Sequence, residues 1–521
     1  MAGFVSLKLS ASMLGMALTL GGCVHQSSKS HESAANVNQS KENATDPWFQ
    51  GSVEEAFTAS KTSGKPVFLY WGAVWCPPCN ELKSQVFSHP EFPELMQSLI
   101  PVYLDGDEPS AQIWGDRLQA AGYPTILMLN AERKEYLRIN GALSFAEFKE
   151  IVQSALNQPE DVLALLQRVD RAELRSSDWT RLAFLDWEQL PAERITLERQ
   201  WQSLDRLVQI RPKDLPPAVQ GSLIAQYIIM SQRLQDEERV KKDIAQRLPN
   251  LRKLLLEISE DPEKTYGARQ MLIFRYGVIV PWLEGNPERP VVSEAWQHAL
   301  TRLSEDERLS VDQRLWLSYP PVEAYRWQHP EKELPGDLVE QVRVAAKEAD
   351  TAAQSKYDRH AVISGAAYLL RQVKLDDAAR ELLHKEIRST DTPWYYYSSL
   401  ANLEEAFGDR PAALRYSQLA RETAKGRATR IQWITNDLLL NLRFQERAER
   451  IRPLVQEFYD LAFQLDDGFL GRNQSRTARI ADGLKPLASS MKPVLEKFQQ
   501  RCQNLEGDNR SSCEAHFKAL I

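Results

Sequence analysis

The sequence predicts a small α/β domain near the N-terminus, followed by a large all-α region. Between residues 52 and 156, short apolar runs alternate with amphipathic stretches, which is typical of buried strands joined by helices. From about residue 160 onward, apolar residues recur at three- and four-residue spacing, as on the buried face of a helix. With 521 residues the chain exceeds one ordinary core, so two or more domains are expected.

The α/β part is expected to form a βαβ unit followed by a hairpin and a closing helix. The stretch 144–147, Ser-Phe-Ala-Glu, has the form of a capping box and opens the closing helix. The expected elements are helices over 52–62, 76–87, 110–121 and 144–156, and strands over 66–71, 100–104, 125–130 and 134–139.

Two cysteines separated by two prolines, Cys76-Pro77-Pro78-Cys79, directly follow the first expected strand. A cysteine attacks disulfides only as a thiolate, and the first turn of a helix offers Cys76 unpaired N–H groups that stabilise the anion. Cys79 lies one turn later on the same helical face, so it can attack a mixed disulfide. Prolines are tolerated at a helix start, where a missing N–H costs nothing. The motif therefore predicts Cys76 as nucleophile and Cys79 as resolving thiol.

The cysteine pair has two alternatives to reversible dithiol chemistry. It could be a permanently oxidised structural clip, or it could contribute to a metal site or be an inactive remnant. A zinc or copper site needs further ligands, but His89 falls on a polar loop, and Cys502 and Cys513 fall in the helical region. We therefore favour the reversible dithiol and expect neither metal nor cofactor.

The stretches "GKPVFLYWGAVWCPPC", "SHPEF" and "GYPTILMLN" resemble periplasmic thioredoxin-like domains of the thiol:disulfide interchange type. The resemblance covers about a fifth of the chain and implies a thioredoxin fold over residues 47–158. It further implies that Trp75 shields the cysteines, and that Pro124, after Tyr123, is a cis proline beside them. Its implied partners are protein thiols or disulfides, together with a redox partner that donates or accepts electrons.

The sequence departs from thioredoxin where the family has a buried aspartate and its paired lysine. Tyr70 stands at the aspartate position, and Pro101 or a neighbour stands at the lysine position. Proton transfer to and from Cys79 therefore lacks its usual carboxylate. Glu81 or a water could substitute, although a solvated helix position is the favoured interpretation of Glu81.

The first 22 residues are expected to be an export signal, because one early charge, Lys8, precedes an apolar run that ends in Leu-Gly-Gly-Cys at 20–23. This ending resembles a bacterial lipobox, which implies lipid attachment at Cys23; an ordinary signal peptide or a short anchor is the alternative. Residues 23–46 are polar and predict a disordered tether. Val24 implies sorting to the outer membrane. We thus expect a lipid-anchored envelope protein that faces the periplasm.

Residues 160–521 are expected to be α-helical, with a weak internal repeat. Alanines recur 35 residues apart at Ala378, Ala413 and Ala448, and Ala366 and Ala401 precede the first two by 12 residues. This period resembles tetratricopeptide-like helix pairs, whose concave surface commonly holds a partner. An irregular all-α domain is the alternative. Charges of both signs are interspersed, as on solvated helix faces, and the aromatic run at 394–398 is expected in the core.

Near the C-terminus, Cys502 and Cys513 flank a turn-rich stretch. We expect a structural disulfide there, because disulfides persist in the envelope.

The net charge of −7 argues against nucleic acid as a partner. The sequence thus predicts a thiol:disulfide oxidoreductase whose helical domain recruits partners. A scaffold protein with a thioredoxin fold as docking module is the rival, and a metal-delivery protein is a weaker one.

Overall fold

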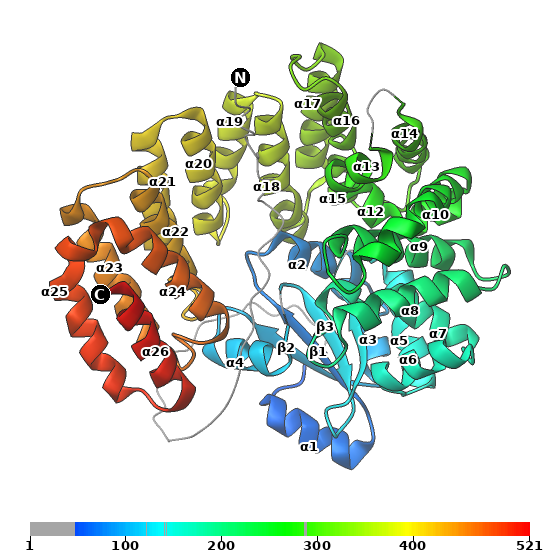
Figure 1. The fold of residues 1–521 in the computed structure, drawn as a ribbon, viewed down its shortest axis with the longest axis horizontal. Helices are drawn as coiled ribbons and strands as arrows, with labels where there is room; N and C mark the ends of the chain where they lie inside the picture. Colours follow the sequence, from blue (N-terminus) through cyan, green and yellow to red (C-terminus); the bar gives the residue numbers. More distant parts are fainter. Residues whose placement is uncertain (1–46, 121, 140, 142, 286–288) are drawn as a thin grey trace. The chain divides into compact units, whose positions relative to one another are not determined.

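The computed structural model describes residues 47–120, 122–139, 141, 143–285 and 289–521. The expected signal, Cys23 and the tether lie outside these residues. Within them, a thioredoxin-like α/β domain with a four-stranded sheet is followed by a large all-helical region (Figure 1), which confirms the predicted fold class. No helix among the described residues is long and apolar enough to cross a membrane.

The sheet has the strand order β2-β1-β3-β4. Strand β1 pairs in parallel with β2 and antiparallel with β3, and β3 pairs antiparallel with β4. Every residue of β1 is buried, because the strand lies inside the sheet. The strands are β1 (Val67–Gly72), β2 (Ile100–Asp105), β3 (Thr125–Leu129) and β4 (Glu135–Ile139), each within one or two residues of its predicted range.

The helices of the α/β domain are α1 (Val53–Ser63), α2 (Pro77–Leu82), α3 (Phe92–Met96), α4 (Pro109–Arg117) and α5 (Phe145–Asn157). Helices α1 and α5 each begin with a capping box, at Ser52 and Ser144. The helix predicted over 76–87 continues after α2 as a π-helical turn, Lys83–Phe87. Helix α4 ends before its predicted limit, since Gln119 adopts a positive φ of 50° that no α-helix continues through. Helix α3 is too short for its periodicity to be detected.

The described residues form two compact units. The larger contains residues 47–111 and 123–426, so it joins the sheet to the helices before residue 427. The smaller contains residues 112–120, 122 and 427–521. The domain limits predicted at 158 and 160 remain predictions.

The remaining helices of the larger unit continue directly from α5. They are α6 (Val162–Arg171), α7 (Ser176–Ala183), α8 (Leu197–Ile210), α9 (Pro217–Arg233), α10 (Lys241–Glu260), α11 (Pro262–Gly267), α12 (Arg269–Phe274), α13 (Tyr276–Glu284), α14 (Val291–Ser304), α15 (Val311–Trp316), α16 (Pro320–Gln328), α17 (Gly336–Ala352), α18 (Lys356–Gln372), α19 (Asp376–Ile387), α20 (Pro393–Phe407) and α21 (Arg410–Thr423). Helices α9 and α11 approach closely: a Cβ on Gly221 would lie 2.0 Å from the carbonyl oxygen of Lys264.

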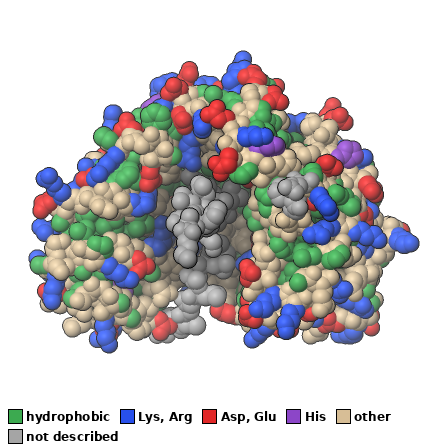
Figure 2. All heavy atoms as spheres, turned by 45° about the horizontal axis from the view of Figure 1, so that its top comes forward, with side chains coloured by type: hydrophobic (Ala, Val, Ile, Leu, Met, Phe, Trp, Pro, Cys, Tyr) green, Lys and Arg blue, Asp and Glu red, His purple; other side chains and the backbone are tan. Residues whose placement is uncertain are grey.

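From α17 to α21, each helix packs on the next. The alanines at 366, 401 and 413 are buried in these helices, whereas Ala378 is half-buried. Whether the helices form a true repeat array remains a prediction. On the face shown in Figure 2, Lys and Arg side chains are interspersed with Asp and Glu, as the sequence predicts for solvated helices.

The smaller unit contains α22 (Arg430–Arg443), α23 (Ala448–Ala462), α24 (Gly471–Leu484), α25 (Ala488–Arg501) and α26 (Gly507–Leu520). Both cysteines of this unit are fully buried, and the structure joins Cys502 to Cys513 in a disulfide. The turn-rich stretch expected between them is mostly helical, because α26 already begins at Gly507. The disulfide thus links the end of α25 to the interior of α26.

Candidate redox site

The site begins where β1 ends and the chain turns into α2. Cys76 is the N-cap of α2, with Pro77 and Pro78 in its first turn, and its Sγ accepts a hydrogen bond of 3.3 Å from the backbone N–H of Cys79. Cys76 is 4% exposed and Cys79 is completely buried. The structure joins the two sulfurs in a disulfide. The motif therefore lies at a helix N-terminus, where backbone N–H groups stabilise an anionic sulfur.

Trp75 and the segment at 123–124 line this turn. The Trp75 indole N–H donates to Asp107 Oδ1 at 3.1 Å, and its ring lies edge-on to Tyr123 with centroids 5.9 Å apart. The Tyr123–Pro124 peptide bond is cis, as the resemblance implies. Pro124 lies near the motif, because a Cβ on Gly141 would be 3.0 Å from Pro124 Cγ and 3.3 Å from the Pro78 carbonyl oxygen.

Two tyrosines, Tyr70 and Tyr103, lie opposite each other on neighbouring strands of the sheet. The strand register places Pro101 opposite Phe68, and the residue opposite Tyr70 is Tyr103, two positions further along β2. The two tyrosine rings stack with centroids 5.2 Å apart. Burial raises the pKa of both hydroxyls well above the ordinary tyrosine value. Neither hydroxyl therefore ionises at neutral pH.

Carboxylates that the sequence analysis missed lie at the end of β2. Burial raises the pKa of Asp105, whose charge is stabilised by the ammonium group of Lys83. Burial in turn lowers the pKa of Lys83, and Asp105 opposes that shift. The sequence signal was the Asp-Gly-Asp run directly after an apolar strand. The strand register pairs Asp105 with Gly72, the last residue of β1, so this carboxyl lies at the end of the sheet from which the redox loop leaves.

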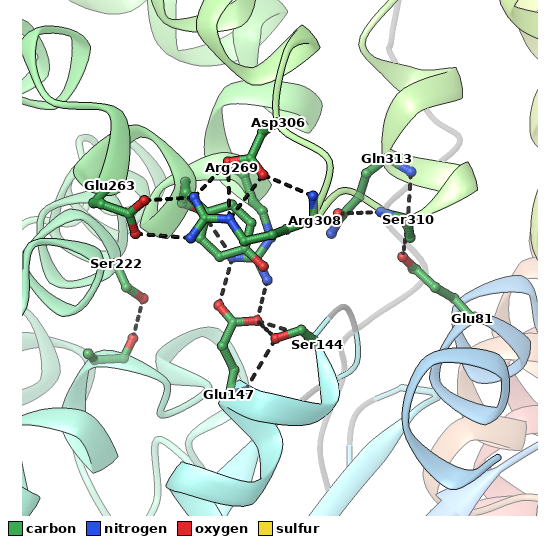
Figure 3. Close-up of polar contacts among 12 residues, drawn as sticks. Glu81, Ser144, Glu147, Ser222, Glu263, Arg269, Asp306, Arg308, Ser310 and Gln313 are labelled. Atoms are coloured by element: carbon green, nitrogen blue, oxygen red, sulfur yellow. Dashed lines mark hydrogen bonds and ion pairs between the residues drawn. The ribbon is translucent and has the colours of Figure 1, made fainter. Parts of the chain in front are cut away.

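Glu81 is neither solvated nor directed at Cys79. It is only 6% exposed, and its Oε1 accepts a hydrogen bond of 2.6 Å from the hydroxyl of Ser310 (Figure 3). Burial raises its pKa. Residues two apart on a helix do not share a face, so Glu81 points away from Cys79. The interpretation of Glu81 as a solvated residue is therefore wrong, and its position argues against proton transfer to Cys79.

A second polar contact joins α5 to the helical region. Arg269 on α12 donates to both carboxylate oxygens of Glu147, at 2.8 and 2.6 Å (Figure 3). Glu147 also accepts from the backbone N–H and hydroxyl of Ser144, the N-cap of α5. Helix α12 is thus bonded to the first turn of α5 by buried, charge-assisted contacts.

Helices α18 and α20 also reach the redox loop, which the sequence analysis did not anticipate. Helix α18 runs beside α2 (Figure 1). Its residue Asp358 accepts a hydrogen bond from the hydroxyl of Ser84, in the turn that continues α2. On α20, Tyr395 stacks on Trp75 with ring centroids 5.9 Å apart. Trp394 and Tyr396 of the aromatic run at 394–398 are buried, as expected, and Tyr395 is half-buried against Trp75.

Residues 48–131 match the family model described as thioredoxin-like. No curated protein matches the chain. A solved structure titled DsbH Oxidoreductase is similar to part of this chain, with 25% sequence identity and a TM-score of 0.21. The match covers 24% of this chain and 96% of the chain of that structure. Among the described residues, no three His, Cys, Asp or Glu side chains gather as metal ligands would.

Proposed function

We propose that the protein is a thiol:disulfide oxidoreductase that acts on protein disulfides through Cys76 and Cys79. The observation that carries the proposal is the placement of Cys76 Sγ at the N-cap of α2, 3.3 Å from the backbone nitrogen of Cys79. A sulfur in this position is stabilised as a thiolate and has its resolving partner one turn away.

In the reductive direction, the Cys76 thiolate attacks one sulfur of a substrate disulfide. A Cys76–substrate bond forms, the substrate S–S bond breaks, and the leaving sulfur takes up a proton. Cys79 loses its proton and attacks Cys76 Sγ, which releases the second substrate thiolate. Two electrons pass from the dithiol to the substrate, and a redox partner must then reduce the Cys76–Cys79 disulfide. Oxidation of a substrate dithiol is the reverse sequence and needs an electron acceptor.

The helical region is the proposed recruiting element for substrate proteins. Tyr395 of α20 stacks on Trp75, which directly precedes the nucleophile, so helical residues border the surface that a substrate must approach.

For localisation we propose lipid attachment at Cys23 and anchoring in the envelope, with the outer membrane favoured. The mass of the mature protein tests this anchor, since lipidation adds a diacylglycerol that Cys23→Ala removes.

Alkylation trapping across a series of glutathione buffers tests the activity. The Cys76–Cys79 pair should pass reversibly between dithiol and disulfide, whereas Cys502–Cys513 should remain oxidised. A Cys79→Ala variant should accumulate mixed disulfides at Cys76, and Cys76→Ala should accumulate none. A pair that never changes state in any buffer would rule out the activity and favour the docking-module alternative.

A further inference from the structure

We propose that Tyr395, supplied by helix α20, is a specificity-determining residue of the redox site. Its ring closes one side of the approach to Cys76, so that a cysteine in an extended, unfolded chain segment reacts much faster than one on the rigid surface of a folded protein. The inference rests on the proposed function and deepens it by naming the substrate class. The helical region then selects substrates, in addition to any role in recruitment.

The redox cysteines are nearly inaccessible in the intact chain. Cys76 is 4% exposed, Cys79 is completely buried, and Trp75 directly before them is 9% exposed. Within the motif, solvent reaches mainly Pro77 and Pro78. Disulfide exchange requires that the attacking sulfur touch a sulfur of the substrate. A substrate therefore has only a small opening through which its sulfur meets Cys76.

Trp75 is a fixed wall of this opening, because three contacts hold its ring. The indole N–H donates to Asp107 Oδ1 at 3.1 Å, and the Tyr123 ring meets it edge-on with centroids 5.9 Å apart. The Tyr395 ring stacks on it, with centroids 5.9 Å apart and planes inclined by 25°. These separations fall within the range of about 4.5–7 Å that favourable aromatic pairs adopt. The contact from α20 thus completes the wall beside the nucleophile.

Tyr395 is held by a packed helix, so a substrate does not displace it easily. Its neighbours Trp394 and Tyr396 are 3% and 1% exposed, and Leu400 further along α20 is completely buried. Helix α20 packs on α18 and α19, and α18 packs on α2. The ring is therefore fixed relative to the redox helix by the fold of the larger unit.

The Tyr395 ring selects by size rather than by charge. Burial raises the pKa of its hydroxyl to about 12, so the side chain is neutral at neutral pH. An extended chain segment is only about 5 Å wide, the spacing of neighbouring strands in a sheet, and its cysteine fits a narrow opening. A cysteine on a folded protein brings the surrounding surface with it, and that surface collides with α20.

The test compares one kind of disulfide in two settings. The probes are glutathione mixed disulfides, one on the cysteine of a short unstructured peptide and one on a surface-helix cysteine of a folded carrier protein. In the reduced full-length protein, Cys76 attacks the substrate sulfur, and glutathione leaves as a thiolate that takes up a proton. Cys79 then displaces the substrate thiol and forms the Cys76–Cys79 disulfide. The release of glutathione gives the rate constant for each probe.

The peptide should react faster than the carrier in the wild type. Loss of an aromatic pair changes an equilibrium constant by about two- to tenfold, so Tyr395→Ala should raise the carrier rate by about that factor and leave the peptide rate nearly unchanged. Tyr395→Phe keeps the ring and should behave as the wild type. The matched control is Tyr397→Ala, because Tyr397 lies on the same helix but stacks on Tyr416, with centroids 6.3 Å apart.

An unchanged ratio of the two rates in Tyr395→Ala would overturn the inference, and so would equal rates for the two probes in the wild type. If Tyr395→Ala does not fold, Tyr395→Trp decides. Its larger ring should slow the carrier further, and a ratio equal to that of the wild type overturns the inference. A wild-type protein that reacts with neither probe would instead refute the proposed function.

Discussion

The Arg269–Glu147 ion pair allows a quantitative test of how the helical region is held to the thioredoxin-like domain. The guanidinium makes two hydrogen bonds to the carboxylate, at 2.8 and 2.6 Å, and the two side chains are 3% and 14% exposed. Removing one partner of a buried pair leaves a desolvated charge, which costs about 3–5 kcal/mol. Arg269→Ala should therefore lower the free energy of unfolding by about that amount.

Arg308 provides a control of similar geometry. It donates to both carboxylate oxygens of Glu263, at 3.0 and 2.9 Å, and its guanidinium also stacks over the ring of Tyr266, as that of Arg269 does. The side chains of this second pair are 45% and 50% exposed. Exposed pairs contribute about 1 kcal/mol or less. Arg308→Ala should therefore change stability far less than Arg269→Ala.

The assay is urea-induced unfolding of the full chain, followed by tryptophan fluorescence, for both single variants and for Arg269→Ala combined with Glu147→Gln. The double variant should recover part of the loss, because the unpaired carboxylate is then neutralised. Equal destabilisation by Arg269→Ala and Arg308→Ala, or no recovery in the double variant, would refute the argument that burial determines the strength of these contacts.

Three further predictions concern stability. Burial raises the pKa of Asp186 to about 7, so the folded protein keeps a proton on this carboxyl that the unfolded chain loses from about pH 4. The free energy of unfolding therefore falls as pH rises from about 4 to about 7. Asp186→Asn should weaken this fall, measured as the urea midpoints at pH 5 and pH 8. Replacing Cys502 and Cys513 by serine should lower the stability of the C-terminal helices by about 3 kcal/mol, measured by thermal denaturation with and without reductant. Gly221→Ala should lower the free energy of unfolding by about 1–3 kcal/mol, because its Cβ would lie 2.0 Å from a backbone oxygen of α11. The control is Gly336→Ala, whose Cβ meets no atom within 4 Å and which should leave the stability in the same thermal denaturation unchanged.

Much of the α/β domain was predictable because its signals are local. Strand β1 is a continuous apolar run, and the closing helix begins with a capping box, so residues a few positions apart determine both elements. The cysteine motif is equally local: Cys76 caps a helix because a strand precedes it and prolines follow it. Such features depend on no long-range contact, and the sequence therefore predicts them within one or two residues.

The contacts that surround the motif were not predictable, because they join residues far apart in the chain. Glu81 meets Ser310, the N-cap of α15, only because the fold brings together two residues 229 positions apart, and a lone glutamate on a short helix carries no signal of burial. Tyr395 reaches Trp75 for the same reason. The position facing Tyr70 was also uncertain, since strand register is set by packing and was needed to identify Tyr103.

Helix α2 carries the redox cysteines at its start and a buried carboxyl, that of Glu81, near its end. A fragment ending at residue 158 would retain the sheet and both sulfurs but would lose the hydroxyl of Ser310. The carboxyl of Glu81 would then be hydrated and would lose the burial that raises its pKa. Redox potentials measured on such an excised fragment would describe a different chemical environment, so quantitative work on this protein requires the intact polypeptide.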